Sequence, residues 1–376
     1  MSEDTHPEPD RVEGAPHPRD TERLIGQIAA ETAFLDAFNS GRLHHAWLLT
    51  GPLGVGKATL AWRIAKFLLA TPEFAEAGLF GDPAPAPATL EIPADHPVAR
   101  RIRAGSEGRL FALRRAWDED RKRLKTVITV DEVRRLKNFL HMSAADGGRR
   151  TVIVDPVDEM NTAAANALLK MLEEPPERVT FVLVSHQPSR LLPTIRSRCR
   201  ELRLAVLAAD DLAEAMQGSG VDITDGTALS ELAGGSVGEA IRLTNLDGLE
   251  TYAAIVRLFE TLPRLDRPQA LKLAESGAQR GAEAKLDLLL ALMDLFLSRL
   301  ARAGVLGVTG SEAAPGEGAL LARLSPDHAA SRRWAALHQS LGARARHGRA
   351  VNLDPAALLL DMILKIDETA GALAAR

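Results

Sequence analysis

The sequence predicts an α/β domain with a parallel sheet, followed by a chain segment that is almost entirely helical. Apolar runs at 46–49, 152–154 and 181–184 read as short buried strands, and helical stretches separate them. From about residue 250 onward the chain is rich in Leu and Ala at helical spacing, with a loop at 307–318. Because ligands of parallel sheets bind beyond the carboxyl ends of the strands, the residues after each run are the candidate functional ones.

Composition limits the class of protein. The chain has 376 residues, 46% hydrophobic and 26% charged, as in a globular protein of two or three domains. No apolar run reaches the roughly 18 residues of a membrane span, and the polar, Pro-rich N-terminus lacks a signal peptide's apolar core, so we expect a cytoplasmic protein. The single cysteine, Cys199, excludes an intramolecular disulfide and a Cys-only zinc site. A net charge of −4 gives no global nucleic-acid signal.

Local patterns outside the strands predict three further features. Residues 1–20 are polar and Pro-rich, which predicts a disordered lead-in. Residues 24–40 show apolar spacing of three and four, which predicts a helix that stops before Gly41. Thr129, followed by Glu132 three residues later, is the pattern of a capping box at the start of another helix.

A glycine-rich turn follows the strand at 46–49 and precedes a helix, in the pattern G-x-x-x-x-G-K of a phosphate loop. The backbone N–H groups and the helix N-terminus of such a loop favour an anion, and its lysine can reach the outer phosphates of a nucleotide. A structural turn that binds nothing would have the same pattern, so both interpretations stay open. The candidate binding residues of this turn are Gly51, Gly54, Gly56 and Lys57.

Two groups that ATP hydrolysis needs are missing. The position after the loop lysine normally carries Ser or Thr to hold Mg²⁺, and here it is Ala58. Thr59 comes one position late and points about 100° round the helix. Asp155 ends the second core strand, where it would orient the Mg²⁺ shell, but the next residue, normally a base, is Pro156. We therefore expect no efficient hydrolysis, with Thr59 and Asp155 as remnants of a nucleotide site.

Arg198 lies in the sequence Ser-Arg-Cys, just past the strand and turn at 181–197. A guanidinium keeps its charge and can fork onto phosphate oxygens. An arginine at the edge of a domain can serve its own site, a neighbouring subunit's site, or a surface ion pair, and the residues alone leave these three open.

A strongly basic stretch at 99–125 also contains Trp117. Basic residues with an aromatic could contact a phosphate backbone. We favour the alternative, a solvated insertion whose charges form ion pairs. The basic residues include Arg100, Arg101, Arg103, Arg114, Arg115, Arg121, Lys122, Arg123 and Lys125.

The segments GPLGVGKAT, NALLKMLEEPP, FVLVSHQPSRLLPTIRSRC and GGSVGEA together resemble the clamp-loader subunits of bacterial DNA polymerase III, an AAA+ family, and most closely those of the delta prime type. The resemblance is clear over about residues 22–245. It implies an AAA+ α/β domain at 21–205 with an insertion at 71–125, a small helical lid at 206–248, and an all-α collar at 249–376 that assembles five subunits into a ring.

The resemblance also implies a role. The ATP-hydrolysing members of the family carry Ser or Thr, an acid, and a lid arginine where this chain has Ala58, Pro156 and Gly238. It therefore resembles the non-hydrolysing stator, in which ATP or ADP could bind without turnover. The family's S-R-C arginine matches Arg198, so the resemblance implies an arginine finger that reaches ATP held by an adjacent motor subunit. The four-cysteine zinc module of many members is absent, so we expect no metal.

The partners implied by the resemblance are the motor and delta subunits of a hetero-pentameric ring, with the sliding clamp and primed DNA reached through the complex. The chain would then belong to a DNA-directed DNA polymerase (nucleotidyltransferase) holoenzyme and work in DNA replication, away from membranes. Two alternatives stay open. One is an active motor ATPase in which Thr59 replaces the missing hydroxyl, and the other is a DNA-binding adaptor that uses the 99–125 stretch.

Overall fold

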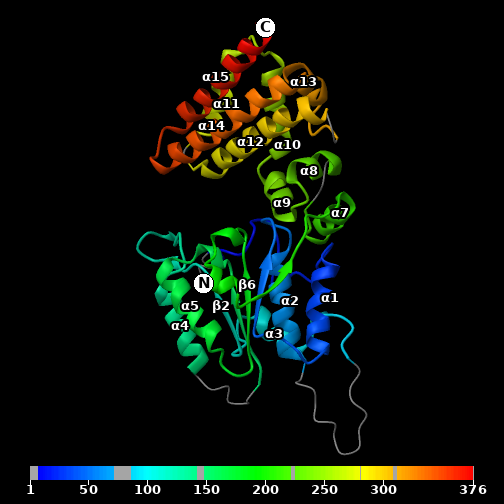
Figure 1. Ribbon diagram of the computed structural model, residues 1–376, viewed down its shortest axis with the longest axis vertical. Coiled ribbons are helices and arrows are strands. Elements are labelled where there is room, and N and C mark those ends of the chain that lie inside the picture. Colours follow the sequence, from blue (N-terminus) through cyan, green and yellow to red (C-terminus); the bar gives the residue numbers. More distant parts are fainter. Residues whose placement is uncertain are drawn as a thin grey trace, which may run out of the picture. The chain divides into compact units, whose positions relative to one another are not determined.

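The chain forms two compact units, seen as ribbons in Figure 1. An α/β unit contains residues 1–222 and 235–238, and a helical unit contains 223–234 and 239–376. Among the described residues, no helix is both long and apolar enough to cross a membrane. The computed structural model describes residues 7–71, 86–141, 148–221, 225–279, 281–307 and 311–375.

The α/β unit is built on a five-stranded sheet of order β2-β5-β6-β1-β7, with every neighbouring pair parallel. The register places Leu48 of β1 beside Leu183 of β6 and Ile153 of β5 beside Val182 of β6. All strands therefore end at one edge, and the predicted parallel sheet is confirmed. The strands are β1 (Ala46–Thr50), β2 (Leu110–Leu113), β5 (Arg150–Val154), β6 (Val179–Val184) and β7 (Arg200–Arg203).

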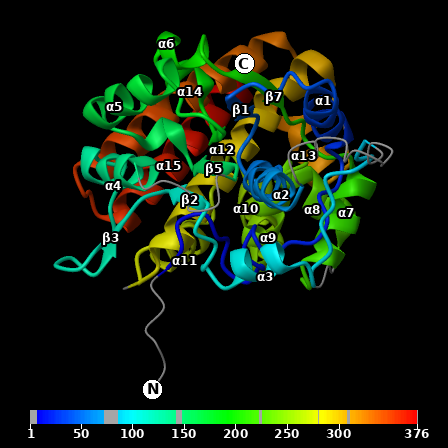
Figure 2. The ribbon, with the colours of Figure 1, turned by 90° about the horizontal axis from the view of Figure 1, so that it is seen from below.

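Helices cover both faces of this sheet. Figures 1 and 2 agree in placing α4 and α5 on one side and α1, α2 and α3 on the other. Alternate strand residues, such as Leu48 and Phe181, pack with buried residues of α4 and α5, such as Leu136 and Leu168. On the other face the Trp47 ring lies 4.9 Å from the ring of Phe34 in α1. The helices are α1 (Ile28–Asn39), α2 (Lys57–Ala70), α3 (Pro97–Arg103), α4 (Val130–His141) and α5 (Thr162–Glu173).

The stretch at 99–125 does more than the sequence suggested, because it includes β2. The four residues Leu110–Leu113 pair with β5 as an edge strand of the main sheet. A small antiparallel hairpin follows, formed by β3 (Trp117–Asp118) and β4 (Arg123–Leu124). The apolar run of β2 is too short, and too surrounded by arginines, to stand out as a strand by composition. Residues 72–85 of the proposed insertion lie outside the described residues.

The starts of α1 and α4 can be compared with the starts predicted from local sequence patterns. Helix α1 begins at Ile28 rather than near residue 24, because Gly26 has a φ of 72° and the buried Gln27 amide donates to the carbonyls of Val55 and Ala205 at 3.1 and 2.8 Å. Ahead of α4, Glu132 accepts from the backbone N–H of Thr129 at 2.8 Å, so this part of the predicted capping box is present.

The predicted disorder of residues 1–20 does not hold for 7–20. There the Asp10 side chain is 2% exposed and His17 is buried. The polar composition predicted disorder because it does not show that these charges find partners on distant strands and helices.

The helical unit agrees with the predicted all-α C-terminal part. Its long helix α12 packs along α14, and α11 packs on α15 (Figure 1). Buried Leu and Phe side chains of α12, among them Leu292 and Phe296, line this core. Its helices are α8 (Gly226–Ala233), α9 (Val237–Asn245), α10 (Gly248–Glu260), α11 (Arg267–Ser276), α12 (Glu283–Leu306), α13 (Glu317–Leu324), α14 (His328–Ala350) and α15 (Pro355–Ala374).

Candidate functional site

The glycine-rich turn has the geometry of a phosphate loop. It joins the end of β1 to the start of α2, and Gly51, Gly54 and Gly56 have φ values of 139°, 78° and 99°. A Cβ on Gly51 would lie 2.5 Å from the carbonyl oxygen of Leu204, so a side chain there would collide with the backbone. These glycines are therefore required by the loop itself, whether or not a nucleotide binds.

Lys57 makes its contacts within this loop. Its ammonium group donates to the carbonyl of Gly51 at 2.7 Å and also to that of Pro52. The residue is only 3% exposed. Burial lowers the pKa of Lys57 to about 8, although the charges of Asp155 and Asp158 act to raise it. The lysine that would meet the outer phosphates is thus bonded to its own loop.

Asp155 lies directly after β5. It is close enough to Lys57 for their charges to interact, although the two side chains form no ion pair. Burial and the charge of Asp10 raise the pKa of Asp155 to about 7, while Lys57 acts to lower it. Within the described part of the chain, its Oδ2 atom is buried and has no hydrogen-bond partner. Burial favours the protonated form of this carboxyl group, whereas orienting a metal ion requires the charged form, which a bound cation would restore.

The acids after Pro156 do not replace the missing base. Asp158 and Glu159 lie on a short 3₁₀ turn, Val157–Glu159. Asp158 accepts from the backbone N–H groups of His186 and Gln187, each at 3.1 Å, and Glu159 forms a 2.8 Å ion pair with Arg115. Burial, with the nearby Lys57 charge, also lowers the pKa of His186 to about 4, so the ring is neutral at pH 7.

The lid position that matches the family arginine, Gly238, is packed tightly against the backbone of the loop. Gly238 donates its N–H to the carbonyl of Gly54 at 3.1 Å, and a Cβ on Gly238 would lie 3.0 Å from the Gly54 Cα. Ser236 also donates to the carbonyl of Leu53 at 2.9 Å. The nearby arginine, Arg242, is paired with Glu239 at 2.6 Å. The residues present therefore do not fit ATP hydrolysis at this site.

The close contact of Gly238 and Gly54 makes a stability prediction. We expect Gly238→Ala to lower the free energy of unfolding by about 1–3 kcal/mol, because the added methyl group meets rigid backbone. Urea unfolding followed by circular dichroism measures the change. Gly218→Ala is the matched control, because nothing lies within 4 Å of its Cβ position. Equal stability of the two variants would contradict the packing argument.

Arg198 lies apart from the loop residues, between α6 (Pro193–Arg196) and β7. Its guanidinium forms a 2.8 Å ion pair with Glu173, the last residue of α5, and donates to the carbonyl of Thr194 at 2.9 Å. The Arg198 side chain is 35% exposed. The structure thus brings Gly51, Gly54, Gly56, Lys57 and Asp155 into one region. Thr59 is the third residue of α2, which begins at Lys57. Arg198 lies at the surface, away from this region.

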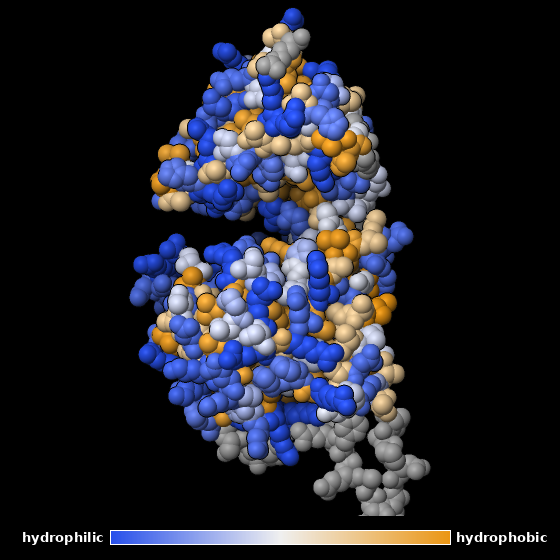
Figure 3. Space-filling model, in the orientation of Figure 1, coloured by the Kyte–Doolittle hydropathy of each residue, from blue (hydrophilic) through white to orange (hydrophobic). Residues whose placement is uncertain are grey.

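Most cations of the 99–125 stretch are paired within the chain. Figure 3 shows a largely hydrophilic surface with hydrophobic residues interspersed. Ion pairs of this density favour the interpretation as a solvated segment over a free basic patch. The pairs are Arg101 and Arg109 with Glu107, Arg103 with Asp20, Arg114 with Asp10, Arg115 with Glu159, Arg121 with Asp118, Lys122 with Glu119 and Lys125 with Glu132.

The residues that the structure describes offer neither a metal site nor a reactive thiol. Within those ranges no group of three or more His, Cys, Asp or Glu side chains is arranged to hold a metal ion. Burial raises the pKa of the Cys199 thiol to about 12, so it stays protonated and unreactive at neutral pH.

Two functional contacts were missed by sequence reasoning. The pairing of Arg198 with Glu173 joins two motifs that are 25 positions apart (198 minus 173), and only the presence of both motifs hinted at it. The contacts of Asp10 with Arg114 and of His17 with Trp62 carry no sequence signal at all, because these partners lie on distant elements.

The fold and the site together define a P-loop ATPase-type α/β protein whose hydrolytic positions are substituted. Residues 26–208 match the family described as "DNA polymerase III, delta subunit". Sequence relatives include a DNA polymerase III subunit delta' of Pseudomonas aeruginosa, 36% identical, covering 62% of this chain and 65% of that protein. The subunit delta' of Escherichia coli is 31% identical, covering 44% of this chain and 43% of that protein. These matches support the assignment of the chain to the delta prime clamp-loader family of DNA polymerase III.

Other matches are more distant. A DNA polymerase III subunit gamma of Buchnera aphidicola is 28% identical over 60% of this chain and 58% of its own length. Among solved structures, a gamma subunit-related protein of Thermotoga maritima is 19% identical over 90% of this chain and 99% of that chain, with a TM-score of 0.43. The chain spans less than two thirds of the length of each curated relative named here.

Proposed function

We propose that this chain is the delta prime subunit of a DNA polymerase III clamp loader, and that it acts in the cytoplasm as a non-hydrolysing stator. The observation that carries this proposal is an intact Ser-Arg-Cys arginine on the same domain as a nucleotide site that has lost three hydrolytic groups. Arg198 is retained, whereas Ala58, Pro156 and Gly238 stand where the motor subunits have a hydroxyl, an acid and an arginine.

The substituted site supports the stator half of the proposal. Ala58 offers no oxygen to Mg²⁺, and Pro156 offers no base for water. The packing of Gly238 on Gly54 would crowd a side chain at the lid position. ATP or ADP could bind here only through the loop and Lys57, without the groups that speed phosphoryl transfer.

The setting of Arg198 supports the arginine-finger half. A half-buried guanidinium held by one carboxylate and one carbonyl is restrained in orientation and still has free N–H groups for a phosphate of a neighbouring subunit. In this proposal the other clamp-loader subunits, motor and delta, are the partners in a five-membered ring, and the sliding clamp and primed DNA are reached through that ring.

The test is the ATPase of a reconstituted loader that carries Arg198→Ala, whose turnover should fall while the ring still assembles. The motor alternative predicts turnover by the isolated chain that Lys57→Ala abolishes. The adaptor alternative predicts salt-dependent DNA binding by the isolated chain that is lost when Arg121, Lys122 and Arg123 are neutralised. The ion pairs of Arg121 and Lys122 within the hairpin speak against this last alternative.

Glu173 should act as a positioning residue for Arg198. We expect Glu173→Gln to lower DNA-stimulated turnover of the loader about threefold to fivefold, because an exposed ion pair contributes up to about 1 kcal/mol to holding the guanidinium. The neighbouring exposed Glu174→Gln is the matched control and should leave turnover unchanged. If Glu173→Gln lowered assembly of the ring rather than turnover within it, the pair would be structural and this prediction wrong.

A further inference from the structure

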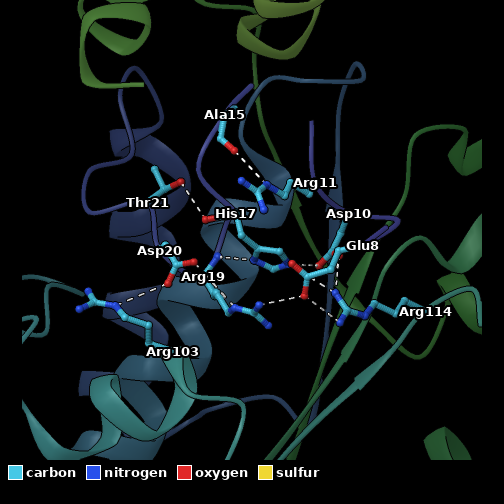
Figure 4. A network of polar contacts seen from close by, with 10 residues as sticks. All are labelled: Glu8, Asp10, Arg11, Ala15, His17, Arg19, Asp20, Thr21, Arg103 and Arg114. Atoms are coloured by element: carbon cyan, nitrogen blue, oxygen red, sulfur yellow. Dashed lines mark hydrogen bonds and ion pairs between the residues drawn. The ribbon is translucent and has the colours of Figure 1, made fainter. Parts of the chain in front are cut away.

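An ordered N-terminal segment lies against the carboxyl edge of the sheet. We call residues 8–17 the strap. Figure 4 shows its Glu8, Asp10 and His17 side chains in a network with Arg114 and Arg19. The strap is turned on itself by hydrogen bonds from Ala15 N–H to the Val12 carbonyl at 3.2 Å and from the Arg11 side chain to the Ala15 carbonyl at 3.1 Å.

The first anchor of the strap is a buried ion pair. Asp10 accepts from Arg114 Nη1 at 2.5 Å, and the Asp10 side chain is 2% exposed. Arg114 also donates to Glu8 at 3.2 Å. Burial by itself would raise the pKa of Asp10, but the His17 hydrogen bond and the Arg114 charge lower it to about 2, so the carboxylate is charged at neutral pH.

The second anchor is His17, which is 2% exposed. Its Nδ1 accepts from the Arg19 backbone N–H at 3.0 Å, which leaves Nε2, 3.2 Å from Asp10 Oδ2, as the donor. The imidazole ring packs edge-on against Trp62 of α2, with 5.5 Å between ring centroids. His17 therefore binds the strap's Asp10 through Nε2 and packs with its ring against α2, the helix that begins at the phosphate loop.

Both anchors lie beside the nucleotide loop. Arg114 directly follows β2, and the Asp155 N–H donates to the carbonyl of Leu113 at 3.0 Å, so Arg114 and Asp155 leave adjacent strands at one edge. Between the anchors, Val12 Cγ2 lies 3.8 Å from the Cβ position of Gly238, and that position lies 3.0 Å from Gly54 of the loop. The strap therefore runs from Arg114, after β2, to Gly238, which packs on Gly54 of the loop, and it lies at the carboxyl edge of the sheet, where such folds bind their ligands.

We propose that the strap competes with a nucleoside di- or triphosphate for the phosphate loop, so that nucleotide binds only when the strap lifts. This inference rests on the degenerate nucleotide site of the proposed function. The strap places the carboxylates of Glu8 and Asp10 at the edge of the sheet where a phosphate group would need cations. It also forms ion pairs with Arg114, a cation at that edge. Lys57, bonded to the loop carbonyls, is 3% exposed in this arrangement.

The experiment measures binding of fluorescent ADP, and of ADP by calorimetry, to the full chain and to a release variant, Asp10→Ala with His17→Ala. Hydrogen exchange of residues 8–17 reports whether the strap has lifted. We expect the release variant to bind ADP at least tenfold more tightly, because apparent affinity is reduced by the fraction of chains in the competent state. Adding Lys57→Ala should remove the gained affinity. By reciprocity, ADP should also speed exchange in the strap of the unchanged chain.

Matched controls and a second variant keep the test decisive. Asp120→Ala with His141→Ala changes the same residue types at exposed positions and should bind as the unchanged chain does. Should the release variant fail to fold by circular dichroism, Arg114→Gln removes the first anchor from the sheet side instead. Equal affinity with and without the strap, or a lifted strap without gained affinity, overturns the proposal. Neither result bears on the Arg198 finger, which is measured by the ATPase of the assembled loader.

Discussion

Replacing Arg198 with alanine should lower DNA-stimulated ATP turnover at the neighbouring motor site about a thousandfold. An arginine finger supplied in trans neutralises charge that develops in the transition state, and such groups contribute about 10³–10⁵ in rate. Steady-state turnover of a reconstituted loader at saturating primed DNA and clamp gives the measurement. When several motor sites work in one ring, single-turnover experiments isolate the site that faces this chain.

The control for Arg198 is its neighbour Arg196, which ends α6 and is exposed. Arg196→Ala removes the same charge two residues away and should keep turnover within about a factor of two, as an exposed charge remote from the site would. Size-exclusion chromatography must show that both variants assemble. Full activity of an assembled Arg198→Ala ring would refute the finger, and an equal loss for Arg196→Ala would point to a general effect of surface charge.

Replacing Glu317 with alanine should destabilise the helical unit by about 3–5 kcal/mol. Glu317 is completely buried at the start of α13, where it forms a 2.7 Å ion pair with Arg299 of α12 and accepts from Tyr252 of α10 at 2.6 Å. It also accepts from the Ala313 N–H at 2.8 Å. Removing one member of a buried pair is costly because it leaves the other charge and donors without partners. Urea unfolding measures the loss.

Glu231 offers a control on the same arginine. It forms a 3.1 Å ion pair with Arg299, but its side chain is 31% exposed, so water can replace it. We expect Glu231→Ala to cost no more than about 1 kcal/mol. Similar losses for Glu231→Ala and Glu317→Ala would mean that burial does not set the strength of this network. Under the proposed function, Glu317→Ala should also impair ring assembly, because Glu317 lies in the segment 249–376 that the resemblance assigns to the collar.

The features that could be predicted from the residues alone are those that depend on short-range order. The strands at 46–49 and 181–184 and the helix from Thr162 were predictable, because a buried strand or helix needs an apolar pattern of fixed period. The glycine loop was equally visible, since its spacing and its place between strand and helix are local. The missing hydroxyl and base were read from single positions, Ala58 and Pro156, relative to that loop.

Which charges form ion pairs, and which residues become buried, follows only from the three-dimensional packing. Asp10 reaches Arg114 across 104 positions, and Arg198 reaches Glu173 across two motifs. Neither the order of residues 7–20 nor the edge strand β2 could be read from composition, because each depends on partners supplied by other elements. The sequence shows Gly238 only as a substitution, and its contact with Gly54 shows in addition that a side chain there would crowd the loop backbone. Period and spacing act along the chain, whereas ion pairing, burial and close backbone contact act through space between residues far apart in the sequence.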